Sequence, residues 1–299
     1  MLTMQPVVLR GRTGLALPEE EFAGRVAAVQ AALAQRDLGA LVAYGDARSY
    51  APLAWLTGLV PMLKWAVAVL PREGEAELFL AMAGPRDLPA MRRIAVAGSA
   101  AAIAALPAAL ARFDRVAVAG LDAMRAGTET AVRRAVDVVE DAERLLADLM
   151  ASPSAREREL LAATATLAHD AATEALRAYA AGAGVTDALL AGDLSARIAG
   201  AHDVRLLWSP DAGRTLRPPG GRVDARPEPL ALYLAVECGG YWGEAVRSSG
   251  PCRLLPLAPL ARMGLAVTEG VEEPLAPGCY SRRGLDPAGA WSSETLEIR

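Results

Sequence analysis

The segment Tyr233-Leu-Ala-Val-Glu-Cys-Gly-Gly-Tyr-Trp-Gly-Glu-Ala-Val-Arg247 predicts a β-hairpin, with two apolar runs around the turn pair Gly239-Gly240. Side chains alternate between the two faces of a strand. One face of the returning arm carries Trp242, Glu244 and Val246, and the other carries Tyr241, Gly243, Ala245 and Arg247. Glu244 therefore shares its face with apolar side chains, where an acid is costly to bury unless it is paired, protonated or bound. The alternative is an exposed face that carries one acid.

Helices are predicted on the N-terminal side of this hairpin. Ser154 followed by Glu157 forms a capping-box pattern that opens a helix ending near Ala181, and Thr186 is predicted to cap a second helix over about 187–199. Strands are predicted at Val204–Trp208, Leu230–Val236, Tyr241–Val246 and Thr295–Ile298. His202-Asp203 lies between helix and strand and is interpreted as a polar turn pair. The second half is therefore two helices followed by a sheet.

A domain boundary is predicted near Ser152-Pro153, which gives domains of 1–151 and 152–299. The first half alternates helical and strand patterns, which is typical of an α/β layer with a mixed sheet. Its predicted strands are Leu38–Tyr44, Trp65–Leu70, Glu77–Ala81, Arg115–Ala119 and Val136–Glu140, and its predicted helices are Pro18–Gln35, 99–111, 122–135 and 143–150. The fold class expected for the whole chain is α+β.

Composition excludes several function classes. The chain has 299 residues and a formal net charge of −4, which argues against nucleic-acid binding, and no apolar run is long enough to span a bilayer. Its three cysteines are scattered and no signal-peptide pattern opens the sequence, so we expect a cytoplasmic protein. Two histidines are too few for a centre that needs several imidazoles.

Several motifs in order along the chain resemble the superfamily of creatinase, prolidase (Xaa-Pro peptidase) and methionine aminopeptidase. The hairpin matches its Gly-Tyr and Arg at Gly240-Tyr241 and Arg247, with Glu244 at an acidic position. Further matches are Trp55-Leu-Thr-Gly58, Gly184-Val-Thr-Asp187, Ser209-Pro-Asp-Ala-Gly213, Met263-Gly-Leu-Ala-Val-Thr-Glu269 and Leu275-Ala-Pro-Gly278. The resemblance implies a creatinase-like N-terminal domain and a truncated pita-bread C-terminal domain.

The resemblance also implies a degenerate metal site. Peptidases of this superfamily hold two divalent metals on two Asp, one His and two Glu. The corresponding positions here are Tyr233, Glu244, Ala261, Gly284 (or Asp286, two residues on) and Ser293 or Glu294. The family's site histidines are also replaced, for example by Thr268. Too few metal ligands remain, so we expect no metal and no other cofactor.

A helical excursion of the superfamily is missing between Arg247 and Gly264. Its absence should leave part of the sheet uncovered, and exposed apolar sheet favours association. We therefore expect a homodimer.

Three functions are compatible with this pattern. The first is a metal-free pseudoenzyme that serves in binding or assembly. The second is a repurposed metal-free enzyme that acts on a small amino-acid-like or peptide-like substrate, in which Arg247 beside Glu244 binds a carboxylate. The third is an active metallopeptidase with a distorted metal site, so the chain's status as an enzyme stays open.

The residues assigned to a site are few. Glu244, Tyr233 and Arg247 are the catalytic candidates, and Tyr241, Thr268 and Glu269 are the candidates for substrate binding. Glu237 and Cys238 could also take part, although Glu237 is expected to be solvated and Cys238 to be a core residue because no histidine follows it closely in sequence.

Overall fold

The computed structural model describes residues 17–61, 63–81, 91–94, 98–211, 215–250, 265–268, 278–285 and 291–298, with the strands Met91–Ile94 and those after residue 250 described by their backbone alone. The described chain forms two compact units that divide between Met150 and Ala151.

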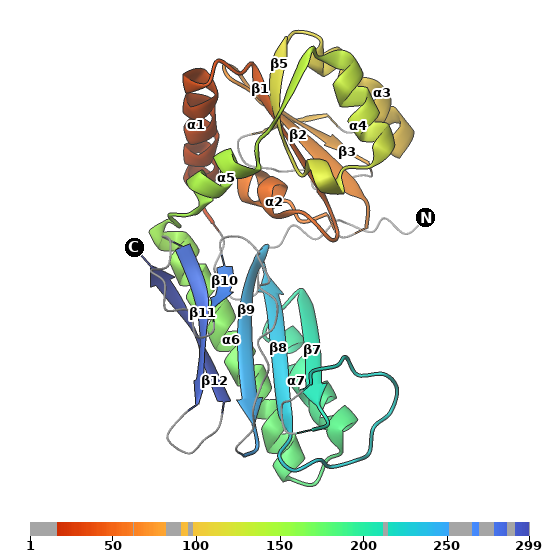
Figure 1. Ribbon diagram of the computed structural model, residues 1–299, viewed down its shortest axis with the longest axis vertical. Helices are drawn as coiled ribbons and strands as arrows, with labels where there is room; N and C mark the ends of the chain where they lie inside the picture. Colours follow the sequence, from red (N-terminus) through yellow and green to blue (C-terminus); the bar gives the residue numbers. More distant parts are fainter. Residues whose placement is uncertain are drawn as a thin grey trace. The chain divides into compact units, whose positions relative to one another are not determined.

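The first unit contains a mixed six-stranded sheet in the order β4-β3-β2-β1-β5-β6. Figure 1 labels β1, β2, β3 and β5 of this sheet. The strands are β1 (Ala40–Asp46), β2 (Trp65–Pro71), β3 (Ala76–Leu80), β4 (Met91–Ile94), β5 (Arg115–Ala119) and β6 (Val138–Asp141). Strands β1 and β5 are parallel, whereas β1 and β2 are antiparallel. The mixed sheet predicted from sequence is confirmed, and β4 is an additional strand.

Helices cover this sheet. They are α1 (Glu19–Gln35), α2 (Ala51–Thr57), α3 (Ser99–Leu110), α4 (Ala126–Ala135) and α5 (Glu143–Met150), with a short 3-10 turn, η1, at Leu121–Ala123. On α1, the apolar side chains Phe22, Val29 and Leu33 are buried. Helix α2 was not predicted, because Pro52 in its first turn and its seven-residue length give little periodic signal.

The second unit begins with two packed helices, α6 (Ala155–Ala180) and α7 (Val185–Ile198). The predicted capping box is present: Ser154 Oγ accepts the Glu157 N–H, and the Glu157 carboxylate accepts the Ser154 N–H. The predicted cap at Thr186 is wrong. Helix α7 starts at Val185, and Thr186 Oγ1 instead accepts the Val223 N–H at 2.7 Å.

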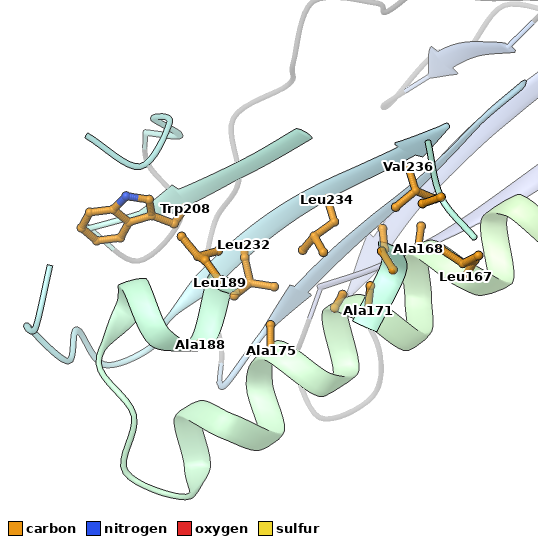
Figure 2. Close-up of a cluster of buried hydrophobic side chains, with 14 of the residues drawn as sticks. Leu167, Ala168, Ala171, Ala175, Ala188, Leu189, Trp208, Leu232, Leu234 and Val236 are labelled. Carbon is orange, nitrogen blue, oxygen red and sulfur yellow. The ribbon is translucent and has the colours of Figure 1, made fainter. Parts of the chain in front are cut away.

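Strands β7 (Asp203–Ser209), β8 (Ala231–Cys238) and β9 (Tyr241–Ser248) form an antiparallel sheet in that order. The predicted hairpin is formed by β8 and β9. Its register runs from the pair of Ala231 with Ser248 to the pair of Cys238 with Tyr241. Figure 2 shows apolar side chains of one face packing on α6 and α7, and we call this the helix face. Among the residues of this core are Ala168, Ala171, Ala175, Ala188, Leu189, Leu232, Leu234 and Val236.

A further three-stranded sheet completes the described part of the second unit. It contains β10 (Leu265–Thr268), β11 (Gly278–Leu285) and β12 (Trp291–Ile298) in that order. Strands β10 and β11 are parallel, β11 and β12 are antiparallel, and β12 contacts β9. The predicted strand Thr295–Ile298 is the end of β12. No described helix is long and apolar enough to cross a membrane.

Candidate functional site

Tyr233 and Glu244 lie on the same face of the β7-β8-β9 sheet, the one opposite the helix face, which we call the second face. Glu244 pairs in register with Ala235, and Tyr233 pairs with Val246, so the two candidates are diagonal neighbours across the hairpin. Both are buried, with 2% of Tyr233 and 3% of Glu244 exposed. The hairpin register thus brings together the first two sequence-predicted catalytic candidates.

The surroundings of this pair are apolar. Tyr233 belongs to a cluster of buried hydrophobic residues on the second face. Its other buried members are Ala231, Ala235, Trp242 and Val246, with Leu207 and Leu216 packed against it. Glu244 therefore has an apolar cluster beside it, as the alternation in the sequence predicted.

Glu237 also lies on the second face, at its hairpin end, and the expectation that it is solvated is wrong. Only 1% of it is exposed. One carboxylate oxygen accepts the Gly240 N–H, and the other lies 3.8 Å from His202 Nδ1. His202 Nδ1 accepts the Gly239 N–H at 3.3 Å, so the polar turn pair expected from sequence includes this imidazole. Glu237 stabilises the turn by accepting the Gly240 N–H, which its position just before two glycines could have indicated.

Arg247 and Tyr241 lie on the helix face, apart from Tyr233 and Glu244. Arg247 pairs with Leu232, and Tyr241 pairs with Cys238. The expectation that Arg247 lies beside Glu244 is therefore wrong, because three residues along a strand place two side chains on opposite faces. Tyr241 donates its hydroxyl to the buried carboxylate of Glu157, with 2.7 Å between the oxygens. This bond ties β9 to the first turn of α6.

Arg205 is a residue of the second face that sequence reasoning missed. It pairs with Ala235, which in turn pairs with Glu244, so the three residues form one row across β7, β8 and β9. Its guanidinium carbon lies 4.5 Å from the centre of the Trp242 ring, and its Nε lies 3.3 Å from an Asp203 carboxylate oxygen. Pairing the predicted strands in register would have revealed it.

Two substrate-binding candidates lie near the end of the chain. Thr268 is the last residue of β10 and pairs with Arg282 of β11. Glu269 lies outside the described residues. Their relation to Glu244 stays a prediction.

Cys238 is buried at the end of β8, and its thiol donates a weak hydrogen bond to the Gly200 carbonyl, 4.0 Å away. Burial, and next the neighbouring Glu237 carboxylate, raise the pKa of this thiol from 9.0 to about 11. A thiol held in this protonated state is a poor nucleophile at neutral pH.

We expect Cys238 to react with iodoacetamide at pH 8 at least about 100-fold more slowly in the native protein than in urea, because the raised pKa lowers the thiolate fraction by that factor. Peptide mass spectrometry over a time course measures both rates. Because the native pKa is the higher one, this group also favours unfolding as pH rises from about 9 to 11. Equal rates in the two states would show that the thiol is accessible and reactive.

Described residues of the first unit line at least two pockets. One, of about 350 Å³, is lined by three arginines and three acids, so its lining charges cancel. These residues are Arg72, Arg112, Arg115, Asp37, Glu73 and Asp114. The other, of about 360 Å³, has alanines of α3 on one side and Glu77 and Phe79 on the other. Neither is lined by a predicted site residue, and the balanced charges of the first favour no ligand of one sign.

The resemblance implied five metal-ligand positions, and the structure describes two of them with side chains, Tyr233 and Glu244. These two residues do not suit a pair of divalent metals. Such ions need several oxygen or nitrogen ligands that converge on one point. Of the two such positions, Tyr233 contributes a phenol inside an apolar cluster and Glu244 contributes one carboxylate. Across the described ranges, no three His, Cys, Asp or Glu side chains converge as a possible metal site.

Solved structures share this architecture. The prolidase from Pyrococcus horikoshii superposes with a TM-score of 0.60 at 12% identity, over 78% of this chain and 66% of that one. The dipeptidase PepE from Mycobacterium ulcerans gives 0.59 at 18% identity, over 80% and 67%. The chain has the fold of these peptidases. The expected α+β class with a pita-bread-like second domain is therefore confirmed.

Coverage differs among these structures. The chain spans about two thirds of the first two, whereas it covers 95% of the Pyrococcus furiosus prolidase structure, with a TM-score of 0.60 and 11% identity. An Escherichia coli aminopeptidase P variant gives 0.57 at 15% identity. No family model matches the sequence, and no curated protein matches it. At these identities the likeness concerns the fold.

Proposed function

We propose that this protein is a metal-free pseudoenzyme on an Xaa-Pro peptidase scaffold, which binds a small peptide or amino-acid-like molecule or serves in assembly. One observation carries the proposal. Tyr233, which stands where the peptidases have their first metal-binding Asp, packs in an apolar cluster with Trp242 and Val246. A buried phenol among hydrocarbon groups supplies packing energy rather than the charge that a divalent ion requires.

Other features of the second face agree with a structural role. Glu237, the other described acid buried there, accepts the Gly240 N–H and so has a function within the hairpin. We place the protein in the cytoplasm on the sequence argument of scattered cysteines, and we propose that it is a homodimer. The missing helical excursion does not support the dimer, because nearly all of β8 and β9, on both faces, is buried in the single chain.

A repurposed enzyme is the second candidate, and one geometric observation favours it. Arg205 and Glu244 lie in one row of the second face, on β7 and β9, and the β8 residue of that row is Ala235. A cation and an acid held two strands apart, roughly 10 Å, could bind the carboxylate and the ammonium group of a small zwitterion. Arg205 would then take the role that sequence reasoning gave to Arg247.

Glu244→Gln distinguishes these functions. As a pseudoenzyme, the wild-type protein should not hydrolyse a panel of Xaa-Pro dipeptides, with or without added Mn²⁺, above the rate of the Glu244→Gln variant. The amide keeps the size of the side chain, so we expect the free energy of unfolding to change by no more than about 1 kcal/mol. Liquid chromatography of the products and thermal melting measure the two quantities.

Tyr233→Phe is the companion variant, because it retains the packing of the ring and removes only the hydroxyl. Its stability should also stay within about 1.5 kcal/mol of wild type. Dipeptide hydrolysis that is present in wild type and lost in folded Glu244→Gln would reject the pseudoenzyme and support a catalytic Glu244.

A further inference from the structure

Helix α7 exposes a stripe of large apolar side chains. Leu190, Leu194 and Ile198 are 57%, 59% and 67% exposed, and they recur every four residues. Five large hydrophobic residues are exposed among those whose side chains are described, and three of them lie on this one helix. Side chains at this spacing form one continuous helical surface, which we call the α7 stripe.

Packing of the opposite side of α7 fixes this orientation. Val185, Ala188, Leu189 and Ala196 are buried there. A Cβ atom at Gly192 would lie 2.9 Å from the Ala171 carbonyl oxygen of α6, so the two helices approach closely at this glycine. Helix α7 cannot rotate to bury its stripe without losing that contact. The stripe therefore faces outward as a consequence of the core.

Charges at the two ends of the stripe have opposite signs. Asp187, near the start of α7, is 46% exposed, and Arg197, near its end, is 46% exposed. Their present partners are Arg222 at 3.1 Å and Asp193 at 3.0 Å, and both pairs lie at the surface. Exposed ion pairs contribute roughly 0–1 kcal/mol, so an exchange of partners costs little.

These features are self-complementary when two copies of α7 run antiparallel. A two-fold axis at the level of Gly192 brings position 187 opposite 197, and position 190 opposite 194. Asp187 then meets Arg197 of the second copy, Leu190 meets its Leu194, and Ile198 lies opposite its Thr186. Parallel helices would instead oppose Asp187 to the same aspartate of the second copy.

We propose that the α7 stripe is a homodimer interface, in which two copies of the chain pack the exposed sides of their α7 helices antiparallel, with the two-fold axis at the level of residue 192. A two-fold arrangement of one self-complementary patch is the commonest form of homo-oligomer. Three partly exposed side chains per copy form a contact below the usual size of a stable interface, so the dimer is weak and populated at high micromolar concentration. The proposal depends on α7 alone and holds whether or not the second face has an enzymatic function.

Sedimentation velocity of the full chain between 5 and 300 µM tests this interface. Wild type should shift from monomer toward dimer with concentration, and Leu194→Glu should raise the dissociation constant at least tenfold with an unchanged melting temperature. Leu63→Glu is the matched control, because Leu63 is 58% exposed and lies in the first unit. It should leave the dissociation constant within twofold of wild type.

Charge reversal tests the antiparallel register. Asp187→Arg or Arg197→Asp alone should raise the dissociation constant several-fold, and the double variant should return it to within about twofold of wild type. A protein that stays monomeric at 300 µM, or a dimer that Leu194→Glu does not weaken, overturns the proposal, and the latter result assigns the dimer to another surface. These outcomes are separate from the dipeptide assay, so the interface and the proposed metal-free pseudoenzyme can fail independently.

Discussion

Replacement of Gly243 by alanine should destabilise the second unit by at least about 3 kcal/mol, beyond the usual cost of overpacking. Gly243 lies on the helix face of β9, directly against the backbone of α6. A Cβ atom there would lie 2.4 Å from the Thr164 carbonyl carbon and 2.5 Å from the Ala165 nitrogen. Backbone atoms cannot move aside as a flexible side chain does, so β9 and α6 must separate.

Thermal melting followed by circular dichroism measures this loss, and we expect a melting temperature lower by roughly 6–12 °C. Gly220→Ala is the control, because a Cβ atom at Gly220 has no heavy atom within 4 Å. A Gly243→Ala protein that melts within 2 °C of wild type would show that α6 does not approach β9 this closely.

Glu157→Ala should destabilise the second unit by about 2–4 kcal/mol, because Glu157 accepts hydrogen bonds from both an α6 cap and β9. Its carboxylate accepts the Ser154 N–H at 2.9 Å and the Tyr241 hydroxyl at 2.7 Å. Its removal breaks the capping box and deprives a buried phenol of this acceptor, and each loss costs about 1–2 kcal/mol.

A double-mutant cycle separates the two losses. Tyr241→Phe alone should cost about 1–2 kcal/mol, and the double variant should cost less than the sum of the single ones by about 1 kcal/mol. Urea denaturation gives the three values. Glu159→Ala serves as the control, because the Glu159 side chain is 52% exposed. Among the ion pairs of the described residues, Glu159 takes part in one, with the exposed Arg156. Strict additivity would contradict the link between Glu157 and Tyr241.

Local signals in the sequence were sufficient for most elements of the second unit. The capping box of Ser154 and Glu157 and the Gly239-Gly240 hairpin depend on residues a few positions apart, so their patterns are complete within a short window. The alternation along β9 also predicted the two faces of the hairpin. The helix cap predicted at Thr186 was wrong because the Thr186 hydroxyl accepts a hydrogen bond from the N–H of Val223, which is distant in sequence.

Which residues share the candidate site with Glu244 could not be predicted from local sequence patterns, because it depends on pairing between strands that are distant in sequence. Alternation separated Arg247 from Glu244, but the superfamily motif suggested that they act together. Arg205 became visible only when the register between β7 and β8 placed it in line with Glu244. The burial of Glu237 likewise depends on the Gly240 N–H and on His202, which precedes β7.

Metal content of the purified 299-residue chain tests the central claim most directly. Inductively coupled plasma mass spectrometry after growth in medium supplemented with Mn, Co, Zn and Fe should find less than about 0.1 equivalent of each per chain. Adding each ion should leave the melting temperature unchanged, because any ion that bound the native state would stabilise it by mass action. Two equivalents of a divalent metal per chain, with a raised melting temperature, would contradict the account.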